Sequence, residues 1–348
     1  MDFRRLTVIL AFLTAGFSFR AFSQSTVSAA PQDPTVLMKL AHDKNGLTGA
    51  DIKPWHMRGA YHSYKDGKLD DEGTYEEWWF SPTQYRLAFT NTKTTQTDYA
   101  TGTVLMREGS QEWLNGPELL LRASLVEPLP ETTQLPEFKL QGNSQKVGKA
   151  KIECVSFTYQ IRAGLAIQSN FFPAACFEPT QPVLRIFTMG AGNQTIYDSI
   201  VAFQGRYLAR QIHVFVGEKL AADLNIDLIE ELKESPESVI TPPASAVPVD
   251  LALIQTREST VRRWPMALIK AAPVYPSDAK TMHAQGTVDV KVIIGIDGHI
   301  QNPQTVDGPK PLRGAALDAA RQWVYRYFNV MGQPRPVETV IHFIFSLG

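Results

Sequence analysis

The sequence predicts an α+β protein with a β-rich N-terminal domain and a small C-terminal domain. Short runs of β-branched and aromatic residues, separated by turn residues, follow one another from Trp55 to Ile229, which is typical of an antiparallel sheet or open barrel. A stretch rich in proline and serine then spans residues 234–255, as expected for a linker. Beyond it, residues 256–348 order their apolar residues as helix, strand, strand, helix and strand, which predicts a compact α+β unit.

The N-terminus has the layout of a secretory signal peptide. Arg4 and Arg5 precede an apolar run of about 14 residues, and small residues at Ala21 and Ser23 follow. This predicts cleavage between Ser23 and Gln24, which removes residues 1–23 and leaves a leader over residues 24–34. The run is shorter than the roughly 20 residues that span a bilayer. The alternative is an uncleaved inner-membrane anchor that leaves the protein facing the periplasm.

Composition excludes one class of partner and suggests one covalent bond. The 348 residues carry a formal net charge of −1, without the basic patch of a nucleic-acid binder. The two cysteines, Cys154 and Cys176, both lie in the exported part. In an oxidising compartment such an isolated pair predicts a disulfide, and two buried free thiols are the alternative.

The β-rich domain, residues 35–233, is expected to begin with one helix over residues 35–42. Its predicted strands cover residues 57–64, 74–80, 84–90, 102–107, 152–161, 183–189, 196–203, 207–216 and 220–229. Three prolines between Glu127 and Lys151 predict a long loop there. One large antiparallel sheet or open barrel accounts for this pattern.

Catalytic and metal-binding signals are poor in this domain. Glu76 and Glu77 are adjacent on a predicted strand, so their carboxylates should point to opposite faces of the sheet. Five nearby residues have metal-ligating side chains but no recognised ligand spacing: His56, His62, Asp70, Asp71 and Glu72. We therefore expect a protein that is not an enzyme and that has no metal or other cofactor.

The first half of the C-terminal domain is predicted to form a helix and two strands. Pro276 suits the first position of a helix, which Gly286 should stop. Asp297-Gly298 predicts the turn into a strand over residues 299–306. Alternate residues of the preceding strand should share one face: Val288, Val290, Val292, Ile294 and Ile296.

The second half adds a helix and a final strand. One apolar helix face is predicted from residues three or four apart: Leu312, Ala316, Ala319 or Ala320, and Trp323. The last strand alternates its apolar residues: Val337, Thr339, Ile341, Phe343, Phe345 and Leu347.

This order and spacing resemble the C-terminal domain of the TonB energy transducers. The residues that carry the resemblance are Tyr275, Pro276, Gly286, Asp297, Gly298, Leu312, Ala315, Ala316, Ala319, Trp323, Tyr325, Gly332 and Pro334. Two positions depart from the pattern. Tyr327 stands where the family often has proline, and Ala272 where well-studied members have glutamine.

The resemblance implies peptide binding by strand addition. Its partner would be the TonB box, an extended peptide of an outer-membrane TonB-dependent receptor, with inner-membrane motor proteins as further partners if the chain is anchored. The candidate binding edge is the last strand, with Tyr275 and Pro276 nearby: Val337, Glu338, Thr339, Val340, Ile341, His342, Phe343, Ile344 and Phe345. Alternatively, the other domain or a second copy covers this edge.

The β-rich domain resembles the LolA/LolB-like lipoprotein carriers, on the segment GTYEEWWFSPTQYRLAFT (residues 73–90) and the strands around it. That family implies an open β-barrel around an apolar cavity for acyl chains. Eight aromatic residues could line such a cavity or simply fill a core: Trp55, Tyr61, Trp78, Trp79, Phe80, Tyr85, Phe89 and Trp113. The alternative function is thus a periplasmic lipid or lipoprotein carrier.

Overall fold

The computed structural model describes residues 33–113, 117–148, 150–158, 166–167, 173–190, 193–255, 267–326 and 328–347. The predicted signal peptide, its cleavage site after Ser23 and nearly all of the leader lie outside these residues. Within the described part of the chain, no helix is long and apolar enough to cross a membrane.

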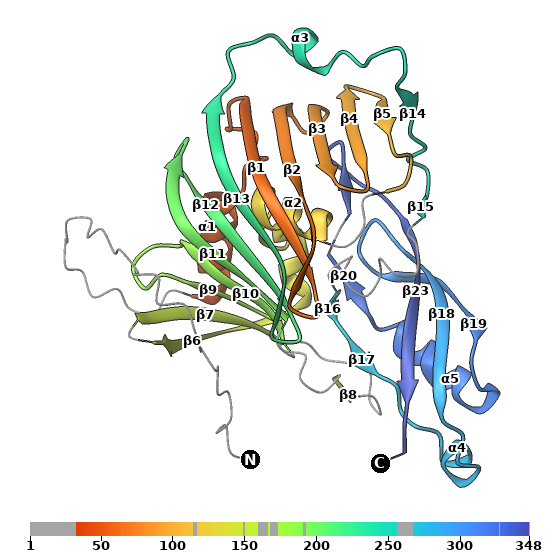
Figure 1. The fold of residues 1–348 in the computed structure, drawn as a ribbon. Coiled ribbons are helices and arrows are strands. Elements are labelled where there is room, and N and C mark those ends of the chain that lie inside the picture. The colour runs from red at the N-terminus through yellow and green to blue at the C-terminus, as the bar shows by residue number, and fades with distance from the viewer. Residues whose placement is uncertain are drawn as a thin grey trace.

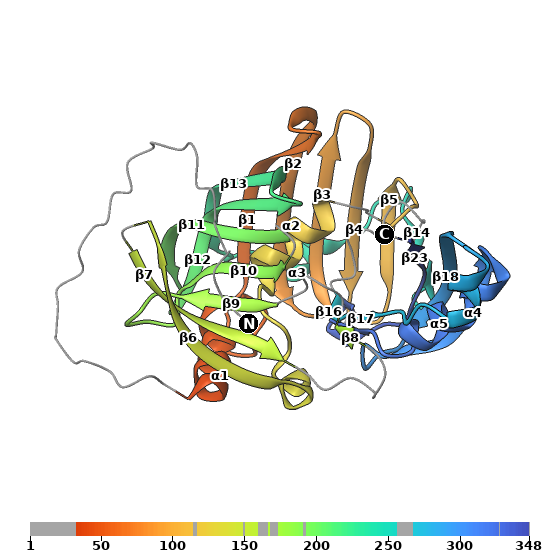
Figure 2. The ribbon, with the colours of Figure 1, turned by 90° about the horizontal axis from the view of Figure 1, so that it is seen from below.

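The N-terminal part is one large antiparallel sheet of thirteen strands. Most of its strands are long and joined by short turns: β1 Trp55–Lys65, β2 Lys68–Ser81, β3 Gln84–Asn91, β4 Thr95–Thr101, β5 Leu105–Gly109, β6 Lys139–Val147, β7 Ala150–Thr158, β9 Ala174–Phe177, β10 Leu184–Gly190, β11 Asn193–Phe203, β12 Arg206–Val216 and β13 Lys219–Glu231. With the short strand β14 Val247–Pro248 at one edge, the order across the sheet is β14-β5-β4-β3-β2-β1-β13-β12-β11-β10-β9-β7-β6. The predicted large antiparallel sheet is confirmed, and it curls into a half-barrel (Figures 1 and 2).

Three helical segments accompany the curled sheet: α1 Pro34–Asn45, α2 Pro117–Val126 and the 3₁₀ helix η1 Thr132–Glu137. Helix α1 begins where it does because Asp33 Oδ1 accepts hydrogen bonds from the amides of Thr35 and Val36, which satisfies donors that the first turn leaves open. Helix α2 packs on β12 and β13, on the concave side (Figure 1). The buried side chains of the sheet and these helices form one apolar core.

Two sequence predictions for this domain are wrong. Gly102 does not begin a strand: its φ of 100° places it in the turn between β4 and β5. Residues 127–151 are not a loop, because they contain η1, β6 and the start of β7. Strand β6 pairs with β7 over its whole length, but its side chains are almost all exposed. It therefore lacks the apolar alternation by which strands are recognised.

The proline-rich stretch lies along the large sheet. It contains α3 Pro236–Ile240 and the two-residue strands β14 Val247–Pro248 and β15 Ile254–Gln255. Strand β14 pairs with β5, and the Val249 amide donates to the Leu105 carbonyl at 2.8 Å. Ser245 Oγ donates to Glu108 Oε1 at 2.6 Å. These bonds fasten the connection to the large sheet near its β5 end.

The C-terminal part is a four-stranded sheet, in the order β15-β23-β18-β19, packed on a helix. Its main elements are α4 Ser277–Thr281, β18 Gly286–Ile294, β19 Ile300–Asp307, α5 Lys310–Ala320 and β23 Val337–Phe345. Short strands complete it: β16 Ala267–Ile269, β17 Ala271–Ala272, β20 Val324–Tyr325, β21 Asn329–Val330 and β22 Gln333–Pro334. Strand β17 also pairs with β8 Ala166–Ile167 of the N-terminal part.

The small sheet is buried on the face that meets α5. The buried side chains are Val288, Val290, Val292 and Ile294 from β18, and Leu312, Ala316, Ala319 and Ala320 from α5. Ile296 departs from the prediction: it is 59% exposed, because β18 ends at Ile294 and Ile296 lies in the turn. Helix α4 also ends earlier than predicted, at Thr281, and Gly286 instead begins β18.

Candidate functional site

Strand β23 lies between β18 and β15 in the small sheet. It pairs with β18 antiparallel along its whole length, whereas β15 pairs, in parallel, with Val337 and Glu338 only. The Ile254 amide of β15 donates to the Pro336 carbonyl at 3.0 Å. Because backbone groups alternate in direction along a strand, the backbone groups of the even-numbered residues point away from β18.

The side chains of β23 alternate as well. The odd-numbered residues, from Val337 to Phe345, are buried against the core, whereas Ile344 is 70% exposed. On the outer face, Glu338 pairs with Lys291 at 2.9 Å and His342 Nδ1 lies 2.7 Å from Asp289 Oδ1. The candidate edge therefore has an apolar side that fixes the strand and a polar side that meets solvent.

Tyr275 lies beside the end of β23, and Pro276 follows it at the start of α4. The Tyr275 ring meets the Phe345 ring edge-on with centroids 5.5 Å apart, and its hydroxyl donates to the Ala284 carbonyl. Pro276 caps α4. This cluster closes the core at the chain's C-terminal end.

Position 298 requires glycine because another backbone segment lies too close to leave room for a side chain. Its φ is 83°, and a Cβ there would lie 2.1 Å from the Tyr325 carbonyl oxygen. The Tyr325 amide donates to the Gly298 carbonyl at 2.8 Å. Asp297 accepts from the His299 amide at 3.0 Å, which stabilises the turn in the manner of short polar side chains. This turn thus positions the segment that carries Tyr325.

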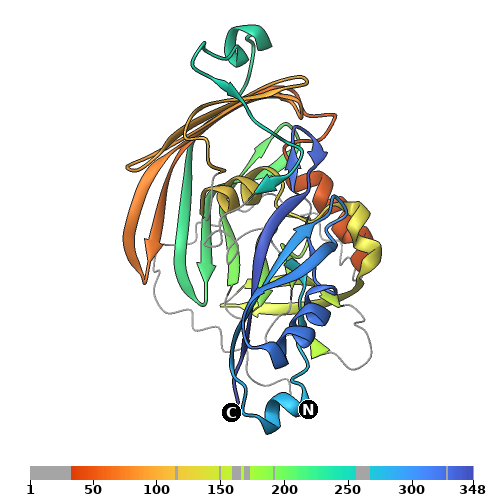
Figure 3. The same cartoon turned by 90° about the vertical axis from the view of Figure 1, so that its right-hand side faces the viewer.

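That segment, residues 323–326 and 328–335, joins the two parts of the molecule. Trp323 packs edge-on to Phe343 of β23 with centroids 5.4 Å apart, and its Nε1 donates to the Ala271 carbonyl at 2.9 Å. Phe328 then meets Trp113 of the N-terminal part at 5.7 Å. The hairpin β21–β22 follows on the concave side of the large sheet, drawn dark blue in Figure 3.

Polar contacts surround this joint. Gln134 Nε2 donates to the Tyr325 carbonyl at 2.9 Å. Arg326 donates to the Glu127 carbonyl and is 6% exposed; burial lowers the pKa of its guanidinium. Asn329 Nδ2 lies 3.4 Å from Glu131 Oε1. Arg326 and Asn329 of the C-terminal part donate to or face carbonyl and carboxylate groups of the N-terminal part, whereas Gln134 of the N-terminal part donates in the opposite direction.

His42 and Glu131 extend this network to α1. His42 Nε2 lies 3.6 Å from Glu131 Oε2. Hydrogen bonding to Glu131 raises the pKa of His42, and hydrogen bonding to His42 lowers the pKa of Glu131. Each group thus stabilises the charged form of the other.

The concave side of the sheet is aromatic but contains a buried ion pair. Arg122 of α2 donates to both carboxylate oxygens of Glu77, at 3.1 and 2.7 Å, and Tyr75 donates a short hydrogen bond to Glu77. Glu77 is fully buried, while its neighbour Glu76 contacts His56 on the opposite face. The two carboxylates therefore point apart, as strand alternation predicts.

The eight aromatic residues divide between these faces. Trp55, Tyr61, Trp79, Tyr85 and Phe89 belong to the main core, where Trp55 and Trp79 stack at 5.8 Å. Trp78 lies on the outer face, stacked on His56 at 4.7 Å, and Phe80 is partly exposed. Trp113 packs on Phe328 at the joint.

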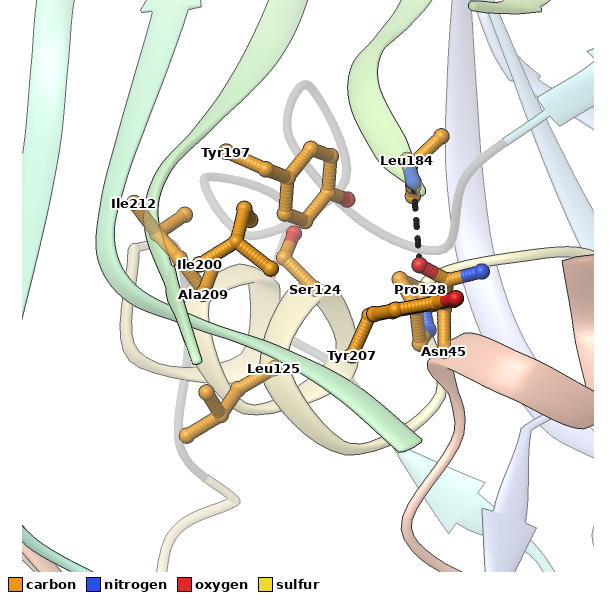
Figure 4. A pocket seen from close by; sticks show the side chains of 10 residues that line it. All are labelled: Asn45, Ser124, Leu125, Pro128, Leu184, Tyr197, Ile200, Tyr207, Ala209 and Ile212. Carbon is orange, nitrogen blue, oxygen red and sulfur yellow. Dashed lines mark hydrogen bonds between the residues drawn. The ribbon is translucent and has the colours of Figure 1, made fainter. Parts of the chain in front are cut away.

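A small pocket opens beside α2, between this helix and β11 and β12 (Figure 4). Its cavity is only about 10 Å³, roughly the room that one water molecule needs, so it is far smaller than a ligand pocket. Asn45 bridges its rim, since its Oδ1 accepts from the Leu184 amide at 3.0 Å and its Nδ2 donates to Pro182. Ser124 and Tyr197 add polar groups to an otherwise apolar lining.

The predicted disulfide is present between Cys154 and Cys176, with Cα atoms 4.0 Å apart on the paired strands β7 and β9. It forms a small cluster with Ile152, separate from the main core. The described residues contain no free cysteine.

The candidate metal ligands are engaged elsewhere. His56 lies between Glu76 and Glu230, at 2.9 and 3.1 Å, and His62 contacts Asp223 at 2.8 Å. Asp71 accepts from the Thr92 hydroxyl and from the Glu72 amide, and Asp70 contacts Lys93. Within the described ranges, no group of three metal-ligating side chains converges on one point.

Sequence reasoning missed the joint between the two parts. Its residues Arg326, Glu127 and Glu131 were not singled out, nor was Met331 of the hairpin. One signal was available: Arg326 is a single charge between two tyrosines, and a charge in an aromatic segment is usually paired when it is buried.

Comparisons with known proteins support the C-terminal prediction. Residues 271–347 match the family profile described as Gram-negative bacterial TonB protein C-terminal. No curated protein sequence matches the chain.

Several solved structures resemble the chain at low similarity. A domain assigned as an outer membrane lipoprotein-sorting protein, from Vibrio parahaemolyticus, is 6% identical with a TM-score of 0.37, over 58% of this chain and 94% of that one. A LolA superfamily protein from Nitrosomonas europaea is 12% identical with a TM-score of 0.32, over 60% and 97%. A DUF1329 family protein from Desulfovibrio piger is 8% identical with a TM-score of 0.31, over 58% and 92%.

Proposed function

We propose that the protein works in the periplasm and binds extended peptides by strand addition to β23, in support of TonB-dependent transport across the outer membrane. The observation that carries this proposal is the match of residues 271–347 to the TonB C-terminal profile. The peptide would be the TonB box of an outer-membrane receptor. Binding of this kind needs no catalytic residue, and main-chain hydrogen bonds supply most of its affinity.

The geometry of β23 supports this mode of binding. The strand is nine residues long, its odd-numbered side chains are fixed in the core, and the backbone groups of Val340 and Ile344 point away from β18. A peptide could thus bind β23 through backbone hydrogen bonds, and the packing of β23 against α5 would stay unchanged. The even-numbered side chains would then contact alternate side chains of the peptide.

The test is titration of the full-length chain with TonB-box peptides from receptors of the same organism. Val340→Pro removes one backbone donor, which is tolerated best where the donor faces outward. We expect it to weaken peptide binding about five- to tenfold, the value of one hydrogen bond. Val340→Thr is the matched control, because it changes the side chain but keeps the N–H.

Two results would contradict this function. One is that no extended periplasmic peptide binds the wild-type chain. The other is that folded Val340→Pro binds as tightly as Val340→Thr.

The proposal places the mature protein in the periplasm, free of the membrane. The connection to the C-terminal part is short and fastened to the large sheet, which does not suit a span across the periplasm. We therefore infer binding without transmission of force. Mass spectrometry of the exported protein should find Gln24 as the first residue; an intact Met1 in inner-membrane fractions would instead favour an anchored transducer that meets motor proteins.

A second candidate function is that of a carrier for lipids or lipoproteins. Its support is the aromatic concave side of the large sheet, where Trp55, Trp79 and Tyr85 lie buried in the core. An acyl chain would have to displace part of this packing to bind there. Binding of fluorescent acyl compounds to the full-length chain tests this function directly.

A further inference from the structure

Strand β15 of the linker already occupies part of the β23 edge (Figure 1). It pairs with the first two residues of β23, so that Ile254 lies opposite Val337. The next pair is Gln255 with Glu338. The Ile254 amide donates to the Pro336 carbonyl at 3.0 Å. A linker segment thus adds a strand to the small sheet, at the edge that we assign to the peptide.

The side chains of β15 alternate as those of an added peptide would. Directly opposite residues of neighbouring strands place their side chains on the same face of the sheet. Ile254 and Val337 are both fully buried, whereas Gln255 is exposed. Backbone hydrogen bonds and sites for alternate side chains are the two elements of recognition by strand addition. Strand β15 therefore has the form of a bound peptide, and Ile254 is its anchor.

This added strand is short and tethered. Strand β15 is two residues long, while β23 is nine residues long. Residues 250–253 separate Ile254 from Val249, whose amide is bonded to the Leu105 carbonyl of β5. Such a tether reaches at most about 18 Å, so β15 acts on its site as an intramolecular ligand, at an effective concentration on the order of millimolar. A peptide that binds in its place competes with this tethered strand.

We propose that β15 holds the first subsite of the peptide edge, and that a peptide which pairs with the whole of β23 displaces it and places an aliphatic side chain where Ile254 lies. This inference rests on the proposed peptide-binding function and adds two features to it. The linker lowers the affinity for every peptide that must displace it. The subsite beside Val337 also selects peptides, because a charged or polar side chain would be buried there without a partner.

Two variants of the full-length chain, each with a matched control, test the displacement. Ile254→Pro removes the anchor and the amide that donates to Pro336, so β15 should leave the edge. Gln255→Pro is its control, because neighbouring backbone amides point in opposite directions along a strand and this amide points away from β23. Ile254→Ser removes only the anchor. Its control is Ala252→Ser, at an exposed position of the same segment.

The first probe is a labelled TonB-box peptide from a receptor of the same organism, titrated by fluorescence anisotropy. Ile254→Pro and Ile254→Ser should bind it at least about tenfold more tightly than wild type, because both remove the competing strand. Gln255→Pro and Ala252→Ser should bind it as wild type does. Hydrogen exchange gives a second readout: the bound peptide should speed exchange at the Ile254 amide of wild type and leave the amides of β18 protected.

The second probe tests β15 apart from any receptor. It is a labelled peptide with the sequence of residues 250–257, DLALIQTR, compared with the same peptide carrying Ile254→Asp. In titrations that extend to millimolar peptide, the Ile254→Pro chain should bind the first peptide at least about tenfold more tightly than wild type, whose own β15 holds the site. The Ile254→Asp peptide should bind neither chain, because its carboxylate would be buried without a partner.

Each other result has a distinct meaning. Equal binding of the receptor peptide by wild type, Ile254→Pro and Ile254→Ser overturns the displacement but leaves peptide binding by β23. Binding of the linker peptide without binding of any receptor peptide removes the proposed function and keeps β15 as a displaceable strand. No binding of the linker peptide by either variant overturns the inference, and equal binding of the two linker peptides overturns the selection at the subsite. If Ile254→Pro does not fold, Ile254→Ser decides alone.

Discussion

The two ends of the large sheet are stabilised in different ways. At the β5 end, the buried side of the sheet meets the C-terminal part, and Arg107 is fully buried there. It donates to both oxygens of Asp98, at 2.6 and 2.8 Å. At the β6 end, the side chains of the last strand are exposed, and the disulfide between Cys154 and Cys176 ties the neighbouring strands on the outer face.

The two ends of the large sheet differ in the contacts that their residues make. Arg107 also donates to the carbonyls of Gln111 and Glu112, and its guanidinium lies 4.5 Å from the Trp113 ring centroid. It thereby orders the segment that carries Trp113 to the joint. The β6 end also packs on the main core, through Val155 and Phe157 of β7, and the disulfide on its opposite face constrains the unfolded chain. The β5 end thus carries a buried polar network, and the β6 end carries a covalent bond on the face opposite the core.

The largest effect is expected from breaking the buried pair. Arg107→Met leaves Asp98 as an uncompensated buried charge and should lower the free energy of unfolding by about 3–5 kcal/mol. Urea denaturation measures this loss.

The control is the double variant Asp98→Leu with Arg107→Met. It removes both charges and should recover much of the lost stability, because replacement of a buried pair by apolar residues is often tolerated. If Arg107→Met alone is as stable as the double variant, the pair does not stabilise this end of the sheet.

A somewhat smaller effect is expected at the opposite end. Cys154→Ala with Cys176→Ala opens a loop with a sequence separation of 22 and should lower the free energy of unfolding by about 2–4 kcal/mol. The reduced wild-type chain should show the same stability as this variant. Labelled thiols in the denatured but unreduced wild-type protein would show that the bond is absent.

The same comparison explains which parts of the fold were predictable. Strands with one buried face, such as β1 and β12, alternate clearly and were located correctly. Strand β6 was missed because it is held in the sheet by pairing with β7, and not by burial of its own side chains. Helix α2 was missed because its residues Pro117–Val126 are apolar with little alternation, and a short apolar run does not distinguish helix from strand.

The candidate site was predictable in its local parts only. The spacing of Tyr275, Gly298 and Trp323 carried the TonB resemblance, because each of these residues is required by contacts within one small domain. The joint brings Arg326 to Glu127, about 200 residues earlier in the chain, and no local pattern encodes a contact of that separation. Met331 was missed for a further reason. The residues around it predict a turn, where a side chain is expected to be exposed, but Met331 is buried.

The smallest predicted effect lies between the two ends, at His42 and Glu131. The pKa of His42 is raised in the folded protein, so its contribution is present below its ordinary pKa of 6.5 and is lost as pH rises through the folded value. The pKa of Glu131 is lowered, so its contribution is present above its ordinary pKa of 4.5 and is lost as pH falls through the folded value. Both contributions are complete together between about pH 4.5 and 6.5. The side chains are 31% and 29% exposed, and solvent screening limits the pair to about 1 kcal/mol or less.

His42→Gln should therefore lower the free energy of unfolding most near pH 5.5, with little effect at pH 9, in urea denaturation repeated across this range. Glu131→Gln should give the same pH dependence. A loss of stability that is constant with pH would show that His42 acts through packing, and that the ion pair does not help to hold α1 at the joint.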